Sequence, residues 1–146
     1  MKGSKLLKAS VFALFCLFPA IAIADTDIEE LLVGSWDFHW GFDIFTDTSG
    51  LIQVEENGGT RPIHMIFHET KIGEWYGPET GVTKTFVWSA EWSEDRNYFH
   101  LRTAFPEWRM EYVLKPLSNG VIIFVASEVG HEDEAWVGTL TRRKQP

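Results

Sequence analysis

The sequence has almost no cysteine, and its basic residues are too few and too scattered to bind a polyanion. Cys16 is the single cysteine among 146 residues, which excludes a framework of disulfides within the chain. Thirteen basic residues are outnumbered by 21 acidic ones, for a formal charge of −8, and the longest basic run covers only residues 142–144. Phosphate backbones and anionic lipids repel such a surface. We therefore expect no nucleic-acid partner and no electrostatic attachment to lipid.

The sequence also lacks the motifs that specify an enzyme or a cofactor. It contains no Gly-x-Ser-x-Gly elbow, no phosphate-binding glycine loop and no His-Glu-x-x-His sequence. Glu69, Glu91 and Glu111 could pair across strands as glycoside hydrolysis requires, and His100 is a further candidate for acid–base chemistry. The sequence does not give their register. We assign no catalytic residue, expect no cofactor, and regard a barrel enzyme as the least favoured interpretation.

Two candidate metal sites do not have the residue spacing that binding of a metal ion requires. His64 and His68 could chelate one ion from a helix, but in a strand they share a face about 13 Å apart, too far for one ion. The acidic stretch over residues 128–134 matches neither a calcium-binding loop nor a zinc motif. We interpret the histidines as ordinary strand residues and the acidic stretch as a solvated turn, and predict no metal site.

The first 24 residues have the three parts of a secretory signal peptide. Three lysines within residues 2–8 precede an apolar run over residues 11–24, which ends in small residues up to Ala24. That run is short for a membrane span, which needs about 20 apolar residues, and an uncleaved anchor is the alternative. We expect cleavage after Ala24 and a periplasmic or secreted domain of residues 25–146 with no membrane span.

Cleavage would make the remaining chain more acidic and free of cysteine. It would remove Cys16, three of the 13 basic residues and none of the 21 acids, leaving 122 residues with a formal charge of −11. A chain of that length buries roughly two-thirds of its unfolded surface, so a core alone can hold it. Such a charge would also attract a basic protein partner.

The hydrophobic pattern after residue 25 is that of short strands. Residues 27–32 fit about one helical turn. Trp36, Phe38, Trp40 and Phe42 then alternate with other residues, which places these four side chains on one face of a strand. Further alternating runs follow, separated by turn residues. The expected strands cover residues 35–42, 51–55, 62–68, 71–76, 82–92, 98–104, 108–114, 121–128 and 134–142.

The connections between these runs indicate the fold class. They are two to seven residues long, and connections this short join antiparallel neighbours. Asn57-Gly58-Gly59 is a strong hairpin signal between the second and third runs. We predict an all-β fold, an antiparallel up-and-down barrel of about eight strands, with a two-sheet sandwich as the alternative.

The start of the first strand resembles that of lipocalins and their calycin relatives. Gly34-Ser35-Trp36 matches their Gly-x-Trp signature. In that family the tryptophan closes the base of the barrel, and a basic residue from the last strand lies across its ring. The resemblance implies this role for Arg142, with Arg143 as second choice, because Arg142 alternates in step with the apolar residues of its strand. The helix and disulfide typical of lipocalins are not seen in this sequence.

The aromatic residues of the strands provide the candidate ligand site. An eight-stranded barrel can hold one small ligand if its own side chains do not fill it. The lipocalin resemblance implies a small hydrophobic or aromatic ligand. Arg102 and Arg109 occupy strand positions from which one of them could supply a polar anchor if it turned inward. The alternative is that the rings are simply the core of an acidic, solid-barrel interaction or inhibitor protein of the cell envelope. The candidate ligand-binding residues are Phe38, Trp40, Phe86, Trp88, Trp92, Trp108 and Tyr112.

Overall fold

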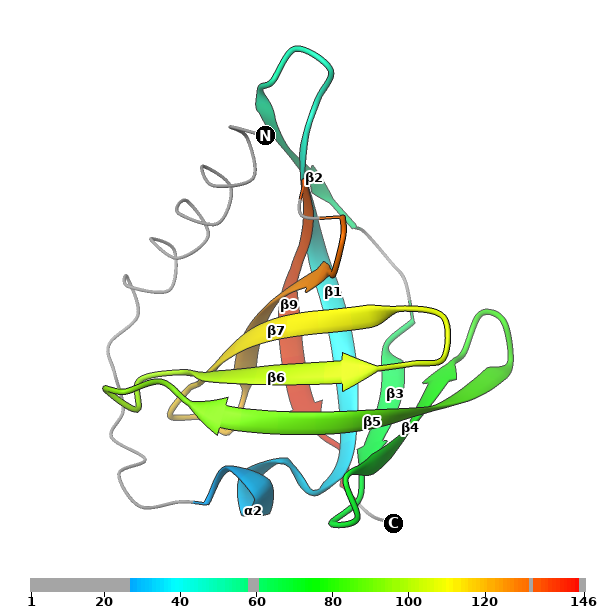
Figure 1. Cartoon of the computed structure of the whole chain (residues 1–146), viewed down its shortest axis with the longest axis vertical. Helices are drawn as coiled ribbons and strands as arrows, with labels where there is room; N and C mark the ends of the chain where they lie inside the picture. Colours follow the sequence, from blue (N-terminus) through cyan, green and yellow to red (C-terminus); the bar gives the residue numbers. More distant parts are fainter. Residues whose placement is uncertain (1–26, 58–60, 132, 145–146) are drawn as a thin grey trace.

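In the part of the chain that the structure describes, alternating apolar residues form nine strands, which close into an antiparallel barrel (Figure 1). The computed structural model describes residues 27–57, 61–131 and 133–144, so the signal peptide expected in residues 1–24 lies outside the described residues. These ranges contain one short helix, α2 (Ile28–Leu32), and no helix in them is long and apolar enough to cross a membrane. The strands are β1 (Gly34–Thr46), β2 (Ile52–Glu56), β3 (Ile63–Phe67), β4 (Ile72–Gly77), β5 (Val82–Trp92), β6 (Phe99–Ala104), β7 (Arg109–Pro116), β8 (Ile122–Glu128) and β9 (Glu134–Arg142).

Strand β1 closes the barrel because it pairs with both β3 and β9. Trp36 lies opposite Met65 of β3 on one side and opposite Arg142 of β9 on the other. From β3 to β9, each strand pairs antiparallel with the next one in the chain. The predicted all-β, up-and-down barrel is therefore confirmed, and the sandwich alternative is wrong.

The prediction that β2 and β3 form a hairpin is wrong. β2 and β3 do not pair with each other; both pair with the edge of β1 that faces away from β9. Asp43 lies opposite Glu55 of β2, and Phe38 lies opposite Ile63 of β3. β2 and β3 thus follow one another along β1 like one interrupted strand, and eight strands encircle the barrel.

A register shift at Gly41 divides β1 into two halves. Trp40 lies opposite Gly138 of β9, but Phe42 lies opposite Val137, so one extra residue has been inserted in β1. Such a bulge reverses which side chains point inward beyond it. Phe42 is consequently 45% exposed, whereas the sequence pattern predicted that it shares the inner face with Trp40.

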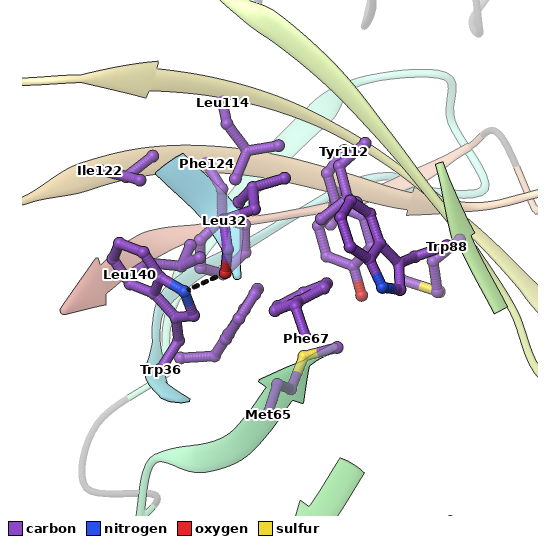
Figure 2. Close-up of a cluster of buried hydrophobic side chains, with 14 of the residues drawn as sticks. Leu32, Trp36, Met65, Phe67, Trp88, Tyr112, Leu114, Ile122, Phe124 and Leu140 are labelled. Atoms are coloured by element: carbon purple, nitrogen blue, oxygen red, sulfur yellow. Dashed lines mark hydrogen bonds between the residues drawn. The ribbon is translucent and has the colours of Figure 1, made fainter. Parts of the chain in front are cut away.

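The half of the barrel next to α2 is filled by its own side chains (Figure 2). Phe38 lies at the centre, with its ring centroid 6.0 Å from that of Tyr112 and 5.4 Å from that of Phe124. Burial raises the pKa of Tyr112 to about 12. The largest side chains here with almost no exposure are Leu32, Trp36, Phe38, Met65, Phe67, Phe99, Leu101, Leu114, Phe124 and Leu140.

Candidate functional site

The base of the barrel is closed by Trp36 and Arg142. The Trp36 indole Nε1 donates a 2.7 Å hydrogen bond to the carbonyl of Leu32 (Figure 2), and the Arg142 guanidinium carbon lies 4.6 Å from the centroid of the Trp36 ring. Arg142 also donates to the carbonyls of Val33, at 3.0 Å, and Leu31, at 2.6 Å. The last carbonyls of a helix have no partner within it and attract cations. These two side chains therefore bind the end of α2 to the barrel.

Gly34 gives Arg142 the space for this contact. Its φ of +126° lies where side chains are strained, and a Cβ built on it would be 2.8 Å from Nη1 of Arg142. The structure thus brings together Gly34, Trp36 and Arg142, the three residues that the lipocalin resemblance singled out. Arg142, and not the second choice Arg143, lies over the Trp36 ring.

The other end of the barrel contains a cavity of about 510 Å³ that opens to solvent. Lys71, whose ammonium pairs with Glu29 of α2, directly precedes β4. From there β4 runs away from α2 to the turn over residues 77–80, which lines the cavity. In Figure 1 this turn joins β4 and β5 at the end away from α2. Ligand pockets in proteins typically have volumes of about 300–1,000 Å³. The cavity is lined by Trp40, Asn57, Arg61, Ile63, Trp75, Gly77, Pro78, Glu79, Thr80, Trp108, Met110, Glu128 and Trp136.

Four of the seven tryptophans line this cavity. Trp40 and Trp136 meet edge to face, with ring centroids 5.5 Å apart and ring planes at 71°. The ring of Trp75 lies over Gly77, where a Cβ would be 2.6 Å from it, so Gly77 leaves room for this indole. Trp108 is stacked on Phe105, with centroids 4.6 Å apart and planes at 21°. These four indoles, with Ile63 and Met110, make the cavity wall largely apolar.

The mouth of the cavity carries charges of both signs. Arg61 and Glu79 are exposed to solvent, whereas Glu128 is half-buried. Glu128 lies opposite Met110, which also lines the cavity, and it continues the inward alternation of β8 after Phe124 and Ala126. Its carboxylate therefore belongs to the cavity rather than to the outer surface.

The structure divides the seven candidate ligand-binding residues between the cavity and the packed half. Trp40 and Trp108 line the cavity. Trp92 is the last residue of β5, where it contacts Phe99. The remaining four, which are Phe38, Phe86, Trp88 and Tyr112, are buried in the core next to α2.

Sequence reasoning missed two tryptophans of the cavity, Trp75 and Trp136. A signal for Trp136 was present, because it alternates in step with Arg142, which was expected to point inward. No comparable signal identified Trp75. Its strand is short, and which of its faces points inward depends on pairing with β3 and β5.

The charged residues considered for an enzyme site or a ligand anchor lie outside the barrel. Arg102 pairs with Glu91, at 2.9 Å, and with Glu111, at 3.7 Å, and all three side chains are more than half exposed. His100 lies opposite Glu91 and so shares this outer face. Arg109 is also exposed. Neither arginine turns inward.

The two histidines considered as metal ligands are separate from each other. The Nδ1 atom of His64 is 3.3 Å from Asp37, and the Nε2 atom of His68 is 3.2 Å from Glu74. Across residues 27–57, 61–131 and 133–144, no group of three or more metal-binding side chains is close enough to hold an ion. Each histidine instead pairs with a carboxylate across the sheet.

Comparison with known proteins gives a likeness in fold. No protein-family model matches the chain, and no curated protein matches its sequence. Among solved structures, pallilysin from Treponema pallidum is similar, with a TM-score of 0.52 and 18% sequence identity over 94% of this chain and 98% of that chain. At this identity the likeness concerns the fold alone. It agrees with the closed antiparallel barrel described above.

Proposed function

We propose that this protein is an exported, lipocalin-like binding protein that holds a small hydrophobic or aromatic ligand at the open end of its barrel. The observation that carries the proposal is the cavity of about 510 Å³ with four tryptophans in its wall. Large aromatic side chains in the wall can bury the apolar surface of a ligand. Removing apolar surface from water is favourable by a free energy of roughly 25 cal/mol per Å². The export part of the proposal rests on the basic and apolar pattern of residues 1–24.

The contrast between the two ends of the barrel favours ligand binding over a solid interaction protein. Next to α2, the interior is filled by fully buried rings such as Phe38, Phe67 and Phe124. At the other end, Trp40, Trp75 and Trp136 are only partly buried and surround open space. A barrel that served only as a scaffold for its acidic surface would gain stability by filling this space.

Titration of tryptophan fluorescence tests the proposal. We expect quenching or a spectral shift with at least one member of a panel of fatty acids, retinoids and aromatic probes, because four indoles would change surroundings on binding. Trp75→Ala should weaken binding at least about tenfold, since it removes one wall of the pocket. Trp92→Ala is the matched control, because Trp92 is also half-buried but lies away from the cavity.

Two results would contradict the proposal. One is a flat response across the whole panel at concentrations up to the solubility of each probe. The other is equal loss of affinity in both variants, which would mean that the probe does not occupy the cavity that Trp75 lines.

A further inference from the structure

The tryptophans of this protein fall into two groups according to the cations next to them. Four rings each have a basic side chain over them: Lys71 over Trp88 at 4.3 Å from the centroid, Lys84 over Trp108 at 4.0 Å, Arg96 over Trp92 at 5.5 Å and Arg142 over Trp36 at 4.6 Å. For the other three, no lysine or arginine of the described ranges lies over the ring. These three are Trp40, Trp75 and Trp136, and all of them line the cavity.

An indole face attracts a cation because its π-electrons are negative, and tryptophan does so more strongly than the other aromatic residues. Trp40 and Trp136 meet at 71°, so they form a corner of two ring planes, and Trp75 contributes a third indole to the same cavity. A corner of aromatic rings of this kind surrounds a rounded cation well, as in the cages that bind quaternary ammonium groups.

A carboxylate completes the arrangement. Glu128 is the half-buried charged residue in the cavity wall, and within the part of the chain that the structure describes its carboxylate has no hydrogen-bond or ion-pair partner. Lys84, at the same end, is already paired with Glu107 at 3.2 Å and lies over Trp108. Arg61 is exposed, so solvent and salt screen its charge. The unmatched charge inside the cavity is therefore negative.

We infer that the cavity takes a ligand with a cationic head, an amine or quaternary ammonium on an apolar body, whose cation sits between the Trp40, Trp75 and Trp136 indoles and the Glu128 carboxylate. This inference rests on the proposed function and narrows its ligand class. The apolar body would lie along the remaining aromatic and aliphatic wall, including Met110 and Ile63. The formal charge of −8 would help to draw such a ligand from solution.

Three probes of similar size and different charge test the inference on the unaltered protein. Phenyltrimethylammonium, its neutral isostere tert-butylbenzene and the anion benzenesulfonate are titrated by fluorescence or calorimetry. We expect the cation to bind about tenfold more tightly than the neutral isostere, and the anion to bind most weakly. Equal or weaker binding of the cation overturns the inference. Binding of the neutral isostere alone would still support an apolar pocket, whereas no binding of any probe would count against the proposed function itself.

Removal of the carboxylate charge tests the part assigned to Glu128. Glu128→Gln should lower the affinity for phenyltrimethylammonium about tenfold and leave that for tert-butylbenzene unchanged. Glu111→Gln is the control, because it makes the same charge change on the outer face and should alter neither affinity. An unchanged cation affinity in Glu128→Gln, with the native circular dichroism spectrum retained, would overturn the assignment of Glu128.

Discussion

Replacing Trp36 with alanine should lower the free energy of unfolding by about 3–5 kcal/mol, as removal of a large buried aromatic side chain does. Trp36 is 2% exposed, donates a hydrogen bond to the Leu32 carbonyl and supports the Arg142 guanidinium on its ring. Alanine would leave a cavity at the base of the barrel and an unpaired carbonyl at the end of α2. Urea denaturation followed by far-ultraviolet circular dichroism measures the loss.

A second tryptophan substitution separates the packing of the ring from its hydrogen bond. Trp36→Phe keeps most of the buried ring and loses the bond to Leu32, so we expect a smaller loss than for alanine, about 1–2 kcal/mol. Val87→Ala is the surface control, since Val87 is 57% exposed, and should change stability by less than about 0.5 kcal/mol. A melting curve of Trp36→Ala that matched the unaltered protein would contradict the assignment of Trp36 as the closing residue.

Replacing Gly138 with alanine should destabilise the fold by about 3 kcal/mol or more, although it adds only one methyl group. A Cβ at Gly138 would lie 2.0 Å from the carbonyl oxygen of His39 and 2.9 Å from the ring of the fully buried Phe124. The first contact is with backbone, which cannot rotate away. To relieve this clash, β1 and β9 would have to separate at the pairing that closes the barrel.

Gly41→Ala is the matched control for this substitution, because Gly41 lies within the same pairing of β1 with β9. Its Cβ would be 3.5 Å from the carbonyl oxygen of Val137, an ordinary contact, so we expect a change of less than about 1 kcal/mol. Comparison of the two urea midpoints is the measurement. Equal midpoints for the two variants would mean that β1 and β9 do not approach as closely as the structure places them.

The positions of the strands could be predicted from the sequence because they depend on local patterns. Alternating side chains and the turn residues between them gave all nine strands within a few residues of their observed bounds. The short helix before the first strand was also predicted. Whether the strands on either side of residues 57–59 pair with each other could not be judged locally, because the same turn residues occur between strands that pair and between strands that do not. Only the pairing of both segments with β1 distinguishes these cases.

The location of the cavity could not be predicted, because it depends on contacts between distant strands. The alternation of β1 placed Phe38 and Trp40 on one face of the strand. However, Phe38 lies in the packed half of the barrel, whereas Trp40 lines the cavity. The bulge at Gly41 turns Phe42 outward, and it is visible only in the register of β1 with β9, which lies almost 100 residues later in the chain. Likewise, Glu128 lies in the cavity wall because of its register with Met110 of β7.

The most direct test of the central claim, that the open end of the barrel binds a ligand while the end next to α2 is packed, uses the seven indole N–H signals in a nitrogen-15 NMR spectrum. The probe is the panel member that binds most tightly. We predict that titration shifts the signals of the four cavity tryptophans, Trp40, Trp75, Trp108 and Trp136, and leaves those of Trp36, Trp88 and Trp92 in place. Shifts confined to Trp36, Trp88 and Trp92 at saturation would contradict the account.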